Sequence, residues 1–318
     1  MKLIVTAPQR SPERLAALER DFPTVQIVAP SEREAVPDVI GDADAVFGTL
    51  TADEFANARA LRWIQSPSAG VEWVGRVPAL ISSEVVVTNM RGAHAATIAE
   101  HAFAVLLTLT RALRSFEVYQ NQHEWARGEI IGQMRGIKGL TMGVIGFGNI
   151  GRAIARRATG FEMNVLAVDA QPVTGSDGVS SVWPLSGLDD LCAASDVLVI
   201  SAPITRETRG MVGASQLARL PHGAYLLAMS RGGIVDEPAL LDALRAGRLA
   251  GAGLDVTATE PLPSDDPLWD APNTIITPHS SPVSTLTSDL VWSILADNIG
   301  RFERGEPLIN VIDKELGY

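Results

Sequence analysis

The chain has 318 residues, of which 46% are hydrophobic and 20% are charged, and its formal net charge is −11. A chain of this length is expected to form about two domains, and its composition is that of an ordinary globular protein. The excess of negative charge speaks against nucleic acid and anionic membranes as partners, because both would repel it. The single cysteine, Cys192, excludes an intrachain disulfide.

The N-terminal part of the chain alternates between apolar runs and segments typical of helices or loops. The runs predict strands at 3–6, 25–28, 45–48, 61–65 and 85–88. Ser11-Pro12-Glu13 supplies an N-cap, a proline for the first helical position and an acid, and predicts a helix that ends near Asp21. This alternation is typical of a parallel sheet with helices between its strands.

The middle of the chain contains a long segment without glycine or proline. Residues 93–119 carry a helical apolar pattern and predict one long, largely buried helix, followed by an arm or connector at 121–138. The apolar stretch 102–109 is too short to span a bilayer. The first apolar run is also too short for a signal peptide, so a cytoplasmic location is expected.

A second strand and helix series occupies the rest of the chain. Strands are predicted at 142–145, 164–168, 197–201, 224–229, 253–256 and 274–277. A helix is predicted at 237–246, before Gly247. A last helix is expected at 284–303, with an extended tail at 308–312.

A glycine motif follows the first strand of this second series. Gly146, Gly148 and Gly151 form GxGxxG between an apolar strand and a helix, which is the context that a dinucleotide site requires. The helix N-terminus then binds the pyrophosphate. Asp169, which ends the next strand, can bind the ribose hydroxyls and repel a 2′-phosphate, so NAD is predicted over NADP. The alternative is that Asp169 only caps its strand.

Three charged or titratable residues each follow an apolar run in the second half of the chain. Arg231, Glu260 and His279 would meet at the carboxyl edge of an open parallel sheet. A histidine with a carboxylate beside it can move a proton near neutral pH, and the arginine fork suits a carboxylate. With a hydride carrier, this set predicts reduction of a C=O next to a carboxylate. The alternatives are a surface arginine, a loop-capping acid and a structural histidine.

At these residues the chain resembles the D-isomer-specific 2-hydroxyacid dehydrogenase family over nearly its whole length. The motifs that carry the resemblance are Gly146–Gly151, Ser230–Glu237, Gly253–Val256 with Glu260–Pro263, and Asn273–His279. The resemblance implies an α/β fold of two Rossmann-like or flavodoxin-like domains with doubly wound parallel sheets. It implies a discontinuous substrate domain at 1–92 plus 284–318, a dinucleotide-binding domain at 93–283, an active site between them and a homodimer.

The resemblance also implies roles for individual residues. Arg231, Glu260 and His279 are the implied catalytic residues. The implied NAD contacts are Gly146, Phe147, Gly148, Asn149, Ile150, Gly151, Asp169, Ala202, Pro203, Thr208, Met229, Ser230, Asp255 and His279. The implied substrate contacts are Ser68, Ala69, Gly70, Val71, Arg231 and His279.

The backbone N–H groups of the Ser68–Val71 loop would hold the substrate carboxylate. Trp73, Met90 and Arg91 are candidate walls of the substrate pocket, and His101 is interpreted as structural. No metal-ligand spacing is visible. The position of Glu260 speaks against formate dehydrogenases of this family, which carry glutamine there.

The predicted function is hydride transfer between NAD(H) and a small 2-oxo or D-2-hydroxy acid. The expected partners are this small molecule and a second copy of the chain, with neither nucleic acid nor membrane. The alternative hypothesis is an NAD(H)-sensing interaction protein without catalysis, as in transcriptional corepressors related to the family.

Overall fold

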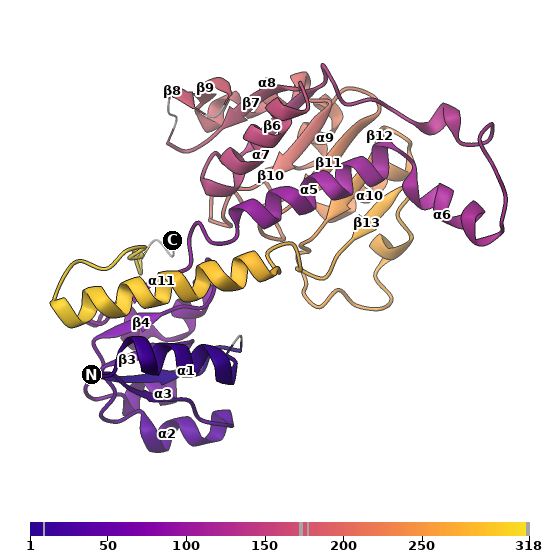
Figure 1. Ribbon diagram of the computed structural model, residues 1–318. Coiled ribbons are helices and arrows are strands. Elements are labelled where there is room, and N and C mark those ends of the chain that lie inside the picture. Colours follow the sequence, from indigo (N-terminus) through magenta and orange to yellow (C-terminus); the bar gives the residue numbers. More distant parts are fainter. Residues whose placement is uncertain (9, 172–173, 177, 316–318) are drawn as a thin grey trace. The chain divides into compact units, whose positions relative to one another are not determined.

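The computed structural model describes residues 1–8, 10–171, 174–176 and 178–315. The chain divides into two compact units, which are both visible in Figure 1. Unit 1 contains Met1–His94 and Val283–Tyr318, and unit 2 contains Ala95–Pro282. The chain thus leaves unit 1 and returns to it, so unit 1 is discontinuous, as predicted.

Unit 1 is built on a five-stranded parallel sheet with the order β2-β1-β3-β4-β5. The strands are β1 (Lys2–Val5), β2 (Gln26–Val28), β3 (Ala45–Phe47), β4 (Trp63–Gln65) and β5 (Val86–Thr88). All five predicted strands of this part of the chain are therefore confirmed, with small shifts at their ends. The order places the point where the winding direction reverses between β1 and β3.

Helices cover both faces of this sheet. The helical elements are α1 (Pro12–Asp21), η1 (Arg33–Ala35), α2 (Val36–Val39), α3 (Ala52–Asn57), η2 (Glu72–Arg76), α4 (Pro78–Ile81) and α11 (Thr285–Arg304). Helices α1 and α11 bury apolar residues in one core, whereas α2 and α4 contribute to the other. Ser11 caps α1 as predicted, since its side chain accepts a hydrogen bond from Arg14 N.

The two chain segments of unit 1 share one core. Trp292 of α11 packs edge-on against Phe47 of β3, with ring centroids 5.5 Å apart. The C-terminal tail also returns to the sheet, where Val311 forms an antiparallel bridge with Thr88. Met90 lies fully buried in this core, so the prediction that it lines a substrate pocket is wrong.

Unit 2 is built on an eight-stranded sheet with the order β13-β12-β11-β10-β6-β7-β9-β8. The strands are β6 (Thr141–Ile145), β7 (Asn164–Val168), β8 (Thr174–Ser176), β9 (Val179–Trp183), β10 (Val197–Ile200), β11 (Ala224–Ala228), β12 (Leu249–Leu254) and β13 (Thr274–Ile276). Pairing is parallel except between β8 and β9. This hairpin was not predicted, and β12 begins at Leu249 rather than at Gly253.

The helical elements of unit 2 include helices that pack on both faces of its sheet. The elements are α5 (Ala95–Thr110), α6 (Leu113–Asn121), η3 (Ile131–Gln133), α7 (Asn149–Gly160), η4 (Leu185–Gly187), α8 (Leu188–Ala194), α9 (Ala214–Arg219), α10 (Glu237–Arg245) and η5 (Pro267–Asp270). Helices α5 and α7 share one core, and α8, α9 and α10 share the other. Both units therefore have the predicted doubly wound α/β architecture.

The long helix predicted over 93–119 is in fact two helices. Helices α5 and α6 meet at 66°, and Ala112 between them adopts a left-handed conformation with φ 51°. The carbonyl of Thr110, the last residue of α5, accepts a hydrogen bond from Arg135 N at 2.8 Å. The break lets α5 remain on the sheet while α6, which has no buried residue, projects away from the body of unit 2 (Figure 1).

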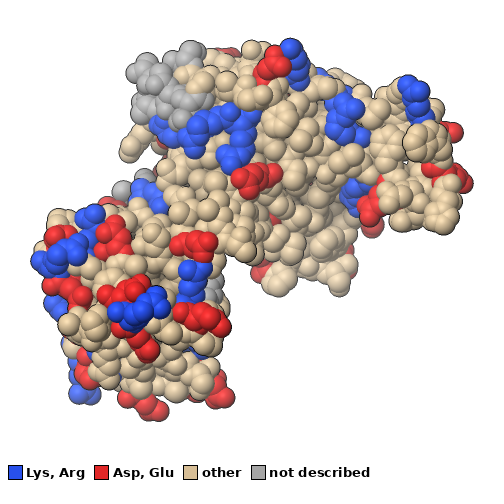
Figure 2. All heavy atoms as spheres, in the orientation of Figure 1, with Lys and Arg blue, Asp and Glu red and all other residues tan. Residues whose placement is uncertain are grey.

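Among the described residues, no single helix is long and apolar enough to cross a membrane, although α5 and α6 pass that test as a bent pair by length and composition. The visible face of unit 1 carries acidic and basic side chains interspersed (Figure 2).

Cys192 lies in α8, where burial and the nearby Asp189 raise the pKa of its thiol to about 11. This cysteine is therefore a core residue rather than a reactive thiolate.

Candidate active site

The glycine motif forms a tight turn between β6 and α7. Gly146 has φ +88°, and a Cβ there would come within 2.5 Å of the Ala202 backbone. A Cβ on Gly151 would lie 2.2 Å from the carbonyl oxygen of Gly146. Gly148, in contrast, is the exposed N-cap of α7, and a Cβ there would meet nothing within 4 Å. Two glycines thus allow close packing, while the third leaves the helix N-terminus open to a pyrophosphate.

Asp169 directly follows β7 and contacts the glycine turn. Its Oδ2 accepts a hydrogen bond from Phe147 N at 2.6 Å, and its Oδ1 accepts one from Gln171 N at 2.9 Å. The acid therefore fixes the turn as well as the end of its own strand. Because a carboxylate has about four acceptor positions, two hydrogen bonds leave room for ribose hydroxyls. The described residues fit NAD at this edge of the sheet.

The loop after β10 packs against the glycine turn. Ala202 is the residue that a side chain on Gly146 would strike. Thr208 is buried, and its hydroxyl donates to Pro203 O and accepts from Thr205 N, each at 2.7 Å. The structure thus shows Thr208 fixing this loop. Met229 and Ser230 are buried at the end of β11.

The predicted trio follows three adjacent parallel strands. Arg231, Glu260 and His279 come after β11, β12 and β13, which are neighbours in the sheet. Their loops therefore leave from the same edge. A Cβ on Gly232 would lie 1.8 Å from the carbonyl oxygen of Thr257, so the loop that carries Arg231 packs directly on the loop that carries Glu260.

His279 and Glu260 form an ion pair or hydrogen bond through Nδ1 and Oε2 at 2.8 Å. Glu260 is held on its other side, where Oε1 accepts from Thr257 N at 3.1 Å. Each of the two side chains is a little over a third exposed. The contact orients the imidazole and leaves Nε2 as the ring nitrogen that can exchange a proton with a ligand.

Asp255 fixes the backbone of the histidine loop. Its side chain accepts hydrogen bonds from Ser280 N at 2.9 Å and from Ser281 N at 3.0 Å, and its carbonyl accepts one from His279 N at 2.8 Å. His279 has φ 49°, a left-handed conformation that costs about 1–2 kcal/mol for a residue with a side chain. The three hydrogen bonds hold the loop in this conformation. The sequence did not reveal this clamp.

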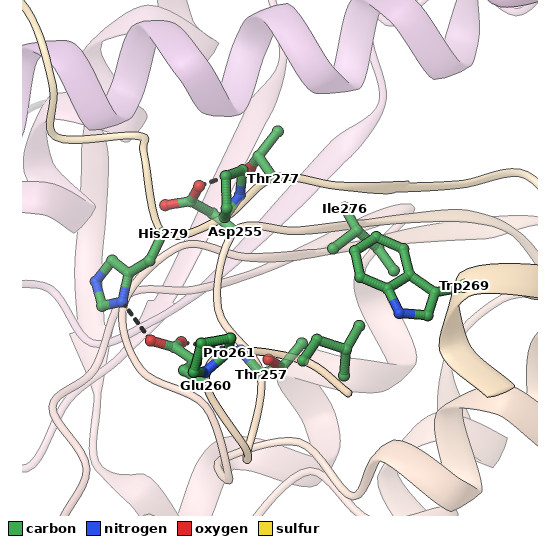
Figure 3. A pocket seen from close by; sticks show the side chains of 10 residues that line it. Asp255, Thr257, Glu260, Pro261, Trp269, Ile276, Thr277 and His279 are labelled. Carbon is green, nitrogen blue, oxygen red and sulfur yellow. Dashed lines mark hydrogen bonds and ion pairs between the residues drawn. The ribbon is translucent and has the colours of Figure 1, made fainter. Parts of the chain in front are cut away.

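A pocket of about 420 Å³ adjoins the pair. Figure 3 shows His279 and Glu260 at one end of it and Trp269 and Ile276 at the other. The indole Nε1 of Trp269 donates to Pro263 O at 2.8 Å, which fixes the ring at the pocket wall. The pocket therefore joins a polar, titratable end to an apolar end.

The Ser68–Val71 loop follows β4 in unit 1. Its shape is fixed by Asn89, whose side chain donates to Ala69 O at 2.8 Å, and by Met90, whose N–H donates to Ser68 O at 3.1 Å. Ser68 Oγ donates to Gly70 O at 2.7 Å. Within the described residues, the backbone N–H groups of 69–71 donate no hydrogen bond to another residue. Such a set of N–H groups can bind a carboxylate.

Residues 103–281 match the model of the family described as D-isomer specific 2-hydroxyacid dehydrogenase, NAD binding domain. The chain belongs to this family. It therefore carries an NAD-binding domain, and the activity of its family is NAD-dependent oxidation and reduction of 2-hydroxy and 2-oxo acids.

Relatives and solved structures match nearly the whole chain. Glyoxylate reductase of Korarchaeum cryptofilum is 34% identical over 99% of this chain and 97% of its own length. D-3-phosphoglycerate dehydrogenase of Archaeoglobus fulgidus is 31% identical over 98% of this chain, which spans only 59% of that relative. A crystal structure of a family protein from Aeromonas salmonicida matches with a TM-score of 0.87 and 33% identity over 98% of this chain and 99% of that one.

Glu237, the first residue of α10, lies beside the Glu260 loop and gives a pH-dependent prediction. Burial raises the pKa of its carboxyl, while the hydrogen bond from Ala258 N opposes this. Because the pKa of Glu237 is higher in the folded state than in the unfolded chain, the protonated carboxyl stabilises the folded protein. This stabilisation is fully present below the unfolded pKa and is lost as pH rises through the folded pKa. We expect Glu237→Gln, which keeps the acceptor for Ala258 N, to be more stable than wild type at pH 7.

This difference should disappear below pH 4.5, the ordinary pKa of the carboxyl, in urea titrations over a pH series. Glu207→Gln is the matched control, because a hydrogen bond from Thr205 lowers the pKa of that exposed carboxyl. We expect Glu207→Gln to be less stable than wild type at pH 7, the opposite of the result for Glu237→Gln. Equal stability of Glu237→Gln and wild type at every pH would contradict the prediction.

Proposed function

We propose that this chain reduces a small 2-oxo acid with NADH, and that it oxidises the corresponding D-2-hydroxy acid in reverse. The observation that carries the proposal is the 2.8 Å contact between His279 Nδ1 and Glu260 Oε2, at the sheet edge where the glycine turn also lies. Residues 95–282 would serve as the dinucleotide-binding domain and the remainder as the substrate domain.

In this mechanism His279 is the general acid. When bound, NADH supplies the hydride for the substrate carbonyl carbon. His279 donates a proton from Nε2 to the carbonyl oxygen as negative charge develops there, and it accepts that proton in oxidation. Glu260 fixes the orientation of the ring through its contact with Nδ1. The His279 side chain is partly exposed, so it can regain its proton from solvent.

Each unit contains one candidate group for binding a carboxylate. Arg231 can offer a planar pair of N–H donors, and the N–H groups of Ala69, Gly70 and Val71 can offer a cradle of partial positive charge. Local donors of this kind are needed because the net charge of −11 repels an anionic acid at longer range.

The second candidate function is NAD(H) sensing without catalysis. The His279–Glu260 pair favours the enzyme, because a sensor needs no proton donor. An assay of NADH absorbance with glyoxylate, hydroxypyruvate, pyruvate and branched or aromatic 2-oxo acids separates the two. Tight NADH binding without turnover of any acid would favour the sensor. The expected absence of nucleic acid partners and the cytoplasmic location stay predictions.

The first prediction for the enzyme concerns His279. His279→Ala should lower turnover of the preferred acid by about 10²–10⁴-fold, because it removes the proton donor, and should leave NADH binding nearly unchanged. Stopped assays and NADH fluorescence titration measure the two quantities. His222→Ala, which removes an exposed histidine, is the control and should retain wild-type turnover. Wild-type turnover by His279→Ala would remove His279 from the mechanism.

Asp169 gives a prediction about the cofactor. The wild type should show a higher kcat/KM with NADH than with NADPH, because the carboxylate repels a 2′-phosphate. Asp169→Asn keeps an oxygen that can accept from Phe147 N, so it should narrow this preference while preserving the glycine turn. Equal or higher efficiency of the wild type with NADPH would contradict the assignment.

We also propose a homodimer formed through α6 and the segment that follows it, at residues 113–131. Leu113, Val118, Trp125 and Ile131 are exposed there, and Trp125 is 98% exposed. Light scattering should give about twice the chain mass of 33.8 kDa, since such apolar side chains favour burial against a second copy. Val118→Asp should shift the protein toward monomer, and Leu286→Asp on α11 should not. A monomeric wild type would exclude the dimer.

A further inference from the structure

A chain of side-chain hydrogen bonds connects α5 to the histidine loop. The hydroxyl of Thr277 donates to Asp255 Oδ1 at 2.6 Å, and His101 Nε2 lies 3.0 Å from the same hydroxyl oxygen. The hydroxyl has only one proton, which it donates in the hydrogen bond to the carboxylate. His101 Nε2 must therefore be the donor in its hydrogen bond with Thr277. His101 Nε2 is 3.8 Å from Asp255 Oδ1, which is beyond hydrogen-bond distance, so the contact between the imidazole and the carboxylate runs through the hydroxyl.

Asp255 connects these side-chain hydrogen bonds to the backbone of the histidine loop. Its side chain is fully buried and accepts hydrogen bonds from Ser280 N and Ser281 N. The carboxylate oxygen that accepts the hydrogen bond from the Thr277 hydroxyl also accepts one from Ser280 N. A shift of Thr277 or Asp255 would therefore move the two residues that follow His279.

Helix α5 provides a fixed point for this chain of contacts. Ile98, Ala102 and Val105 are buried in the core of unit 2, so they anchor the helix around His101. The helix lies directly on β12, because a Cβ on Gly253 would come within 2.3 Å of Val105 Cγ1. His101 is one helical turn before Val105, and Asp255 is two residues after Gly253. Both residues therefore lie to the same side of the contact between Val105 and Gly253.

We propose that His101 is a positioning residue that fixes the His279 loop through Thr277 and Asp255. Its imidazole donates to Thr277, which orients the hydroxyl toward Asp255, and Asp255 then holds the N–H groups of residues 280 and 281. The sequence-based interpretation of His101 as structural is thereby extended to a role in the reaction. The role in catalysis depends on the proposed function of His279, whereas the effect on the loop can be measured without it.

The test compares His101→Ala, His101→Gln and the control His222→Ala in the full chain. We expect His101→Ala to lower kcat about five- to tenfold, the loss of one hydrogen bond, with unchanged KM for NADH. Hydrogen–deuterium exchange of the amides at 279–281 should become faster, because Asp255 no longer holds them rigidly. The amide of His101→Gln can donate to Thr277 and should restore most of both properties. His222→Ala should alter neither.

A double-mutant cycle identifies the route. Thr277→Val removes the hydroxyl that joins His101 to Asp255, so the double variant with His101→Ala should lose no more activity than the worse single variant. Additive losses, unchanged exchange at 279–281, or faster exchange without a change in kcat would each overturn the inference. A wild type that turns over no acid would overturn the proposed function instead, and the exchange experiment would still report on the loop.

Discussion

The parallel pairing of β11, β12 and β13 is the constraint on which the proposed active site depends. Ala228, Leu254 and Ile276 are partners in register, so the three strands end together. Neighbouring strands lie about 4.8 Å apart, which brings the three following loops within side-chain reach. The close approach of Gly232 to Thr257 O then fixes two of these loops against each other, and the hydrogen bond from Thr257 N holds Glu260 within its own loop.

Local sequence signals predicted much of the fold. The Ser11 cap and the GxGxxG turn were found because their chemistry is contained in a few consecutive residues. The start of β12 and the break at Ala112 were missed because their causes are distant in sequence. Gly251 and Gly253 weaken a local strand pattern, yet they admit Asn273 and Val105, and the carbonyl of Thr110 pairs with Arg135 rather than continuing the helix.

In the proposed site, too, features with a local sequence signal were predicted and features that depend on distant residues were not. Arg231, Glu260 and His279 could be named from sequence because each follows an apolar run, and parallel strands place such residues at one edge. The clamp around Asp255 could not be named, because Asp255 follows β12 whereas Thr277 and Ser280 follow β13, and neither local pattern shows that their side chain and backbone groups meet. Met90 was misassigned because a position next to a proposed loop does not show whether a side chain points into the core.

The two carboxylates near His279 differ in burial, and this difference suits different tasks. Asp255 is fully buried, where a charge is tolerated only when hydrogen bonds surround it, and Thr277, Ser280 and Ser281 provide them. Glu260 and His279 remain partly exposed, so the proposed proton donor can exchange with solvent. The buried acid thus fixes the backbone that carries the imidazole, while the exposed acid orients the ring. A group that must change its protonation state in each cycle gains from this separation, because its charge can change without disturbing the loop that places it.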